Sequence, residues 1–250
     1  MSVIKPFIRT YRPFIEDINS NPIYITHEGY ADSPKHYIRA YLLLQKDFLN
    51  LLDYIEPSYT NLNTYSFRIH ELLSRVCIEI EANFKAILIE NGYRKRSNLN
   101  MNDYKKINRS HKLSEYRVKF PVWDGDKSIR SPFSSWEENE SPTWWEAYNN
   151  SKHNRQSKFK EASFVNLTDA IAALTIVISS QFWIYEFYKN QPEHIISDDS
   201  YEVDDFNETT GDYFRIKYPQ KWTKEDLYDF DWSKLKKVSD PFQEYDYNSI

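Results

Sequence analysis

The amino-acid sequence predicts an all-α protein, a helical bundle with a basic loop insertion and an acidic, aromatic C-terminal extension. Long segments repeat apolar residues at the three-and-four spacing of helices that bury one face. Only four glycines occur in 250 residues, which argues against a turn-rich all-β fold. Hydrophobic residues make up 40% of the chain, so a sizeable core can form.

The first two helices have the clearest signals in the chain. The first is predicted over residues 35–54, because Ser33-Pro34 supplies the N-cap and first-turn residues in front of an apolar stripe. The second is predicted over residues 64–91 and ends at Asn91-Gly92, a common C-terminal stop. Its stripe comprises Ile69, Leu72, Leu73, Val76, Cys77, Ile80, Phe84, Ile87 and Leu88.

The later elements are less regular. A third helix is predicted over residues 142–159 and a fourth over 160–189, with a continuous helix left open as an alternative. Residues 170–188 are long enough to span a membrane, but Gln181 and Glu186 interrupt them and favour a buried helix of a protein outside the membrane. Short strands are expected at residues 23–26 and 115–123, the second at a sheet edge because it contains Pro121.

Changes in composition divide the chain into three parts. Residues 1–34 form an N-terminal arm, residues 35–189 a helical domain with an insertion at 93–141, and residues 190–250 an acidic extension. The acidic run of the extension begins at Asp198 and ends at Asp212, and aromatic residues continue beyond it. A disordered tail would be poorer in aromatics, so part of the extension is expected to pack on the helical domain.

Several classes of protein and site are excluded. The single cysteine, Cys77, cannot form an internal disulfide or a cysteine-based zinc site. Glycine-rich nucleotide-binding motifs and metal-ligand histidine spacings are absent, so neither a cofactor nor a metal is expected. The net charge of −5 gives no overall basic footprint for nucleic acid. The first residues lack a long apolar stretch, and a cytoplasmic protein is therefore expected.

The candidate chemistry lies in WWEAYNNSKHNR, residues 144–155. On a helix, Asn149 and His153 share one row, and Tyr148, Lys152 and Arg155 lie on the adjacent row. A histidine can move a proton near neutral pH, and cations can stabilise charge on a phosphoryl group. These types therefore fit a phosphate-handling site, although aromatic residues at helical spacing also fit an ordinary core and a lone histidine fits a structural role.

This segment resembles the motif of the HEPN superfamily. CIEIEANFKAIL in the second helix is followed, after an insertion, by YNNSKHNR and a long apolar helix, and the resemblance covers residues 36–189. The family motif is an Arg, often with a polar residue directly after it, four to six residues before a His. Asn149 and His153 match, and Tyr148 stands at the Arg position. Glu79 and Glu81 lie in the segment where the family often has an orienting acidic residue, and Tyr148 is a further candidate for that role. A structural salt-bridge ladder with Arg68 and Arg75 fits Glu79 as well.

The resemblance implies a homodimeric helical bundle and a metal-independent endoribonuclease of a bacterial toxin–antitoxin or antiphage defence system. His153 would be the general acid/base for attack of a ribose 2′-hydroxyl on the adjacent phosphate, and Lys152 or Arg155 would replace the missing Arg. The alternative is a non-catalytic HEPN-like module that binds RNA or a protein partner, such as an antitoxin or a defence-system component. The missing Arg favours this alternative, and the cluster of His153, Lys152 and Arg155 favours the ribonuclease.

A basic segment in the insertion offers a candidate RNA-binding surface. Residues 94–119 contain nine Lys or Arg and only two acidic residues, a balance of +7, with tyrosines interleaved. Such a segment can follow a phosphate backbone while its rings stack on bases, although a solvated loop has the same composition. The acidic extension could also fold over the segment and neutralise it. The predicted RNA contacts are Arg94, Lys95, Arg96, Lys105, Lys106 and Arg109.

Overall fold

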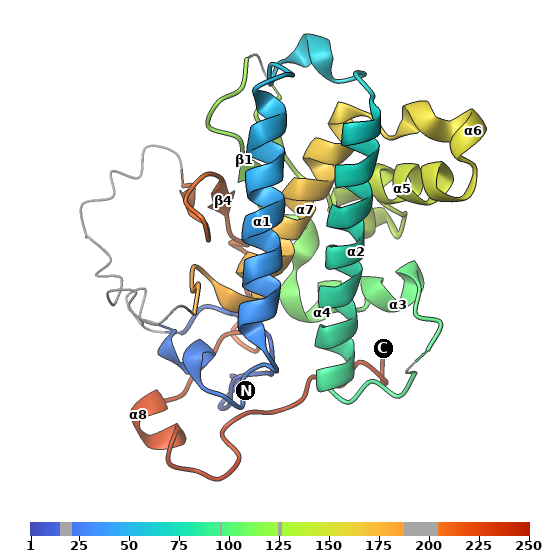
Figure 1. Ribbon diagram of the computed structural model, residues 1–250. Coiled ribbons are helices and arrows are strands. Elements are labelled where there is room, and N and C mark those ends of the chain that lie inside the picture. The colour runs from blue at the N-terminus through green and yellow to red at the C-terminus, as the bar shows by residue number, and fades with distance from the viewer. Residues whose placement is uncertain (16–21, 96, 125–126, 188–204) are drawn as a thin grey trace.

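The body of the protein is built of helices that pack on one another (Figure 1). The computed structural model describes residues 1–15, 22–95, 97–124, 127–187 and 205–250. Helices α1 (Pro34–Leu52) and α2 (Phe67–Glu90) lie side by side, α7 (Phe164–Phe182) packs behind both, and α5 (Thr143–His153) packs against α2 and α7. The bounds predicted for α1 and α2, residues 35–54 and 64–91, are correct to within three residues.

Helix α7 lies at the centre of the body. Each of its residues from 170 to 182 is buried, and it packs against α1, α2 and α5. Among the described residues it is also the one helix long and apolar enough to cross a membrane, yet 83% of its most apolar window is buried within the protein. Burial on that scale is typical of a core helix. The helix ends at Phe182, before the predicted end at residue 189, and residues 188–189 lie outside the described part.

An antiparallel sheet packs beside the helices, so the all-α prediction is wrong and the fold is mixed α/β with helices dominant. Its strands are β1 (Arg117–Lys119), β2 (Ile129–Arg130), β3 (Asn207–Glu208) and β4 (Arg215–Lys217), in the order β2-β1-β4-β3. Val118 of β1 is paired with Ile216 of β4. Strands of two or three residues are too short to show an alternating pattern, and their partners lie far apart in the sequence.

Other element predictions also need correction. Residues 23–26 form a 3-10 helix (Ile23–Thr26) and not a strand. Strand β1 lies inside the sheet, because Pro121 falls beyond its end and leaves both edges free to pair. The predicted third helix is broken at Asn154, whose φ of −135° and ψ of 59° are not helical. A separate short helix α6 (Arg155–Lys158) follows.

Short elements complete the fold. They include the 3-10 helices η2 (Tyr59–Asn61), η3 (Leu113–Glu115), η4 (Ser134–Glu138) and η5 (Phe159–Glu161), and the helices α3 (Met101–Lys105), α4 (Ile107–His111) and α8 (Trp232–Leu235).

The N-terminal arm and the C-terminal extension pack on each other. Tyr228 of the extension forms parallel bridges with Val3 and Phe14, and its hydroxyl donates a hydrogen bond to the carbonyl of Thr10 at 2.7 Å. One hydrophobic core joins both ends of the chain to the helices; it includes Tyr24 and Tyr30 from the arm and Phe214, Ile216, Tyr228 and Tyr247 from the extension. Residues 198–204, which hold four of the seven acidic residues of the predicted acidic run, lie outside the described residues.

Arg9 fixes the arm to the ends of α2 and α7. Its side chain is fully buried, and Nε lies 2.7 Å from a carboxylate oxygen of Glu90, a close ionic contact without good hydrogen-bond geometry. Its Nη1 donates to Gln181 Oε1 at 3.0 Å and its Nη2 to the carbonyl of Asp32 at 2.7 Å. The guanidinium carbon also lies 4.5 Å from the ring centre of Tyr37. A buried charge needs such a set of partners to be stable.

Candidate functional site

One face of α5 is buried and fixes the direction of the motif side chains. Trp144, Trp145 and Tyr148 are each less than 9% exposed. Trp144 Nε1 donates to the carbonyl of Pro132 at 2.9 Å, and the ring of Trp145 lies 6.3 Å from that of Tyr104. These contacts turn the opposite face of the last helical turn toward solvent.

Tyr148 stands where the HEPN motif has its Arg, and its side chain is 3% exposed. Its ring packs on Trp145 with 5.5 Å between ring centres. Lys152 covers it: the ammonium donates to the Tyr148 hydroxyl at 3.3 Å and lies 5.2 Å from the ring centre. Position 148 is therefore part of the core, and the cation that contacts it is Lys152.

His153 is the last residue of α5 and is exposed. Its side chain makes no hydrogen bond or ion pair with any residue in the described part of the chain. Asn149, one turn earlier, is half-buried. Arg155 lies beyond the break at Asn154, and its guanidinium carbon lies 6.0 Å from the ring centre of Phe67, the first residue of α2.

These residues belong to an exposed basic surface at this end of the bundle. We call it the α6 basic surface and define it by Lys152, His153, Arg155, Lys158 and Lys160. Residues 152–160 contain four Lys or Arg and no Asp or Glu. Within the described residues, no carboxylate oxygen lies within 4.0 Å of the side-chain nitrogens of Lys152, Arg155 or Lys160.

Lys158 differs from its neighbours because it pairs with Glu161, with 2.7 Å between Nζ and Oε1. Asn150 also donates to Glu161, at 2.9 Å. The hydrogen bonds from Lys158 and Asn150 hold the pKa of Glu161 below its usual range. This carboxylate therefore closes the turn from α5 to η5 and neutralises one of the four cations.

Glu79, the predicted orienting acid, lies elsewhere. It follows Phe67 by twelve residues on α2, about 18 Å along the helix axis. Its carboxylate accepts a hydrogen bond from Asn83 at 3.2 Å, and Asn83 accepts one from Gln181, the partner of Arg9. Burial raises the pKa of Glu79. It belongs to the polar network around Arg9 and not to the α6 basic surface.

Half of the predicted RNA-contact residues are engaged within the protein. Lys95 pairs with Asp103 at 2.7 Å, Lys105 donates to the carbonyl of Asn139, and Lys106 donates to the carbonyl of Tyr247 at 3.4 Å. Arg94 and Arg109 are exposed, and Arg96 lies outside the described residues. The basic segment therefore presents fewer free cations than its composition predicts.

Three aromatic residues beside the α6 basic surface were missed by sequence reasoning. Tyr65 and Phe67 are 43% and 67% exposed, and Phe159 is half-buried. The ring centre of Phe159 lies 4.7 Å from that of Phe67 and 5.9 Å from that of Tyr65. The sequence held a signal for the exposure of Tyr65 and Phe67, because both precede the apolar stripe that begins at Ile69 and so do not belong to the buried face of the helix.

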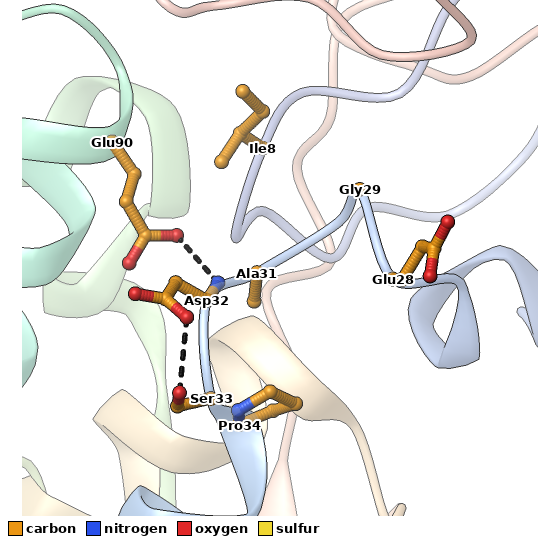
Figure 2. Close-up of a pocket in the computed structure, with 8 residues that line it drawn as sticks. All are labelled: Ile8, Glu28, Gly29, Ala31, Asp32, Ser33, Pro34 and Glu90. Atoms are coloured by element: carbon orange, nitrogen blue, oxygen red, sulfur yellow. Dashed lines mark hydrogen bonds between the residues drawn. The ribbon is translucent and has the colours of Figure 1, made fainter.

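A cavity of about 500 Å³ lies at the other end of the bundle, by the N-terminus of α1 and the C-terminus of α2 (Figure 2). Glu90 accepts a hydrogen bond from the backbone N–H of Asp32, and the Asp32 carboxylate accepts one from Ser33. Glu28 lies apart from both. Glu90 is about 35 Å along α2 from Phe67, so this cavity is remote from the α6 basic surface.

The described residues contain no group of three or more His, Cys, Asp or Glu side chains placed to hold a metal ion. The α6 basic surface instead brings together exposed cations, a histidine and exposed rings, a combination that suits a polyanion with aromatic bases. The resemblance of its motif to the HEPN superfamily rests on the sequence pattern. No family model, curated protein or solved structure matches this chain.

Proposed function

We propose that this protein binds RNA through the α6 basic surface. The observation that supports this proposal is that Lys152, Arg155 and Lys160 are exposed and lack a carboxylate partner among the described residues. Unpaired surface cations can neutralise phosphates and release condensed counterions, which supplies most of the affinity of non-specific nucleic-acid binding. Cations already held by carboxylates contribute less.

The choice of this surface over the basic segment at residues 94–119 has a physical reason. In that segment Lys95, Lys106 and Lys112 are engaged by Asp103, the Tyr247 carbonyl and Asp226. Those contacts would have to break before a phosphate could bind. In the α6 basic surface, Lys158 is held by Glu161, but Lys152, Arg155 and Lys160 have no carboxylate to leave among the described residues. The choice of RNA over DNA rests on the resemblance of YNNSKHNR to the HEPN motif.

The test is a charge-removal variant, Lys152→Gln/Arg155→Gln/Lys160→Gln. We expect at least a tenfold loss of affinity for a labelled RNA at 100 mM salt, because three phosphate contacts are lost. The slope of log affinity against log salt concentration should fall by about 2, since each lost contact with a single strand contributes about 0.7. Fluorescence anisotropy between 50 and 300 mM salt measures both quantities.

The matched control removes three exposed lysines elsewhere, Lys46, Lys236 and Lys237, by the same change to glutamine. It has the same net charge as the test variant, and we expect it to lose less than threefold in affinity. Equal losses in the two variants would mean that the affinity for RNA depends only on the overall charge of the protein, and the proposed site would then be wrong.

A second candidate function is the metal-independent endoribonuclease, with two copies of the chain meeting at the motif helices. The observation that favours it is the exposure of His153 next to Lys152, the cation that covers Tyr148. His153 would take the proton of a ribose 2′-hydroxyl as its oxygen attacks the adjacent phosphorus, and Lys152 would hold the phosphate oxygens. The 5′-oxygen of the next nucleotide would leave.

Total RNA incubated in EDTA with the wild-type protein tests this second candidate. We expect cleavage that falls at least 100-fold in His153→Ala, the usual contribution of a general acid or base. His36→Ala, which removes an exposed histidine from α1, should cleave like the wild type. Cleavage that survives in His153→Ala would rule out this role for the residue. If the wild-type protein binds RNA without cleaving it, only the binding function remains supported.

A further inference from the structure

Exposed rings meet at the junction of α2 and η5. Phe67, Tyr65 and His70 all lie within 6 Å of Phe159 by ring centres, at 4.7, 5.9 and 5.6 Å. We call these four residues the α2 ring cluster. Phe67 and Tyr65 keep 67% and 43% of their surface in water. Large apolar groups gathered on a surface are more informative than single exposed ones, because they mark binding sites.

Two cations of the α6 basic surface lie over rings of this cluster. The guanidinium carbon of Arg155 is 6.0 Å from the ring centre of Phe67, and Lys160 Nζ is 5.7 Å from that of Tyr65. Neither cation has a carboxylate partner among the described residues. Each ring face is therefore next to a positive charge that remains free to meet a phosphate.

The backbone under the cluster is fixed. The chain before α2 pairs with the start of α7, through a bridge between Tyr65 and Ser163 and backbone hydrogen bonds from Phe164 to Thr64 at 2.7 Å and from Val165 to Leu62 at 2.9 Å. A ligand that stacks here therefore loses little free energy in ordering the backbone that carries the rings.

We propose that the α2 ring cluster stacks on unpaired bases, and that the ligand of this site is a single-stranded segment of RNA. This inference rests on the proposed function. A flat ring accepts the face of any base, whereas the base faces of a duplex are covered by neighbouring base pairs. Arg155 and Lys160 then lie beside the bases, where the phosphates of the same strand run. The cluster contributes stacking, and the cations contribute charge.

The charge distribution favours a nucleic acid over a protein ligand. A protein segment that buried Phe67 and Tyr65 would also have to bring carboxylates to Arg155, Lys160 and Lys152 at once. A nucleic-acid strand carries rings and negative charges in regular alternation along one chain. The ligand that matches alternating rings and cations is therefore a strand with bases and phosphates.

The test compares Phe67→Leu with Phe67→Tyr in the full-length protein. Leucine keeps an apolar side chain without a ring, and tyrosine keeps the ring. Three labelled probes with the same number of phosphates are titrated by anisotropy: oligouridine, the same strand with abasic sugars, and a blunt RNA duplex of half the length. Circular dichroism and the thermal midpoint confirm that each variant is folded, which Phe67 should allow because it is 67% exposed.

We expect the wild-type protein to bind oligouridine at least tenfold more tightly than the abasic strand or the duplex, within the range of stacking on one or two rings. Phe67→Leu should lose about tenfold for oligouridine and keep its affinity for the abasic strand, while Phe67→Tyr keeps both. If Phe67→Leu binds oligouridine like the wild type, or if the duplex binds equally well, the inference is overturned and RNA binding by the cations stands. If no probe binds the wild type, the proposed function fails as well.

Discussion

Replacing Arg9 with alanine is expected to lower the free energy of unfolding by about 3–5 kcal/mol, the usual effect of removing one member of a buried ion pair. The guanidinium is fully buried and contacts Glu90, Gln181 and the Asp32 carbonyl. Without it, the Gln181 side-chain oxygen is buried with no donor, and the Glu90 carboxylate, 22% exposed, keeps its charge without its partner.

Arg9→Lys should rescue little of this loss. A lysine has one nitrogen in place of the three that reach separate partners here, and it has no guanidinium to place over the ring of Tyr37, 4.5 Å from the ring centre.

The matched control is Arg75→Ala. Arg75 also forms a short ion pair, 2.6 Å from a carboxylate oxygen of Asp47, but the two side chains are 46% and 40% exposed. An exposed pair of this kind contributes less than about 1 kcal/mol. Urea unfolding followed by circular dichroism measures both variants. Equal losses for Arg9→Ala and Arg75→Ala would show that burial of the Arg9 network adds nothing to stability.

The helical body of the fold could be predicted because its signals are local. Pro34 and Asn91-Gly92 mark helix ends by their own backbone preferences, and the ends of α1 and α2 lie close to them. The predicted N-cap Ser33 instead has a positive φ of 49° and makes no capping hydrogen bond with its side chain. The apolar stripe from Ile69 to Leu88 fixes the buried face of α2 in the same way. These features depend on residues within a few turns of each other.

The sheet could not be predicted in this way, because its stability comes from pairs that are distant in sequence. Val118 gains its strand conformation from Arg130 on one side and Ile216 on the other, and neither partner is visible in the residues next to Val118. The strands are also too short for an alternating pattern.

Only the part of the candidate site that lies within one segment could be predicted, because the rest depends on residues that are distant in sequence. Helical spacing placed His153 one turn after Asn149 and Lys152 one turn after Tyr148, but it could not show that Lys152 covers Tyr148 or that Asn154 ends the helix. The rings that lie beside the cations come from another helix, at Phe67, and only the fold brings them to Arg155. Spacing within one segment cannot reveal a contact between segments.

A chain that ends at residue 204 is expected to lose cooperative unfolding, although its missing part lies outside the helical body. Four aromatic or aliphatic residues of that part are fully buried: Phe214, Ile216, Tyr228 and Tyr247. Each one stabilises the folded state by about 1.5–3 kcal/mol through burial, so their joint loss is comparable with the whole stability of a domain.

The truncation also removes specific partners inside the remaining chain. Strand β1 loses β4, and the Ser110 hydroxyl loses the hydrogen bond it shares with Tyr247 at 2.6 Å. The rings of Phe14 and Tyr24, which pack against Tyr228 with 5.9 and 5.8 Å between centres, become exposed to water. We therefore expect a broad thermal transition and binding of a hydrophobic dye in place of a sharp unfolding curve.

The control is a chain that lacks only Ser249 and Ile250. Both residues are exposed, so their removal should leave the thermal midpoint unchanged.

The truncation at residue 204 also separates two roles for residues 205–250. If they are a removable cover of the basic segment, the chain ending at residue 204 will stay folded and bind RNA more tightly, because Lys106 and Lys112 lose their contacts with Tyr247 and Asp226. If they complete the core, as their burial indicates, that chain will not fold cooperatively, and the basic segment can be freed only by point changes such as Asp226→Asn.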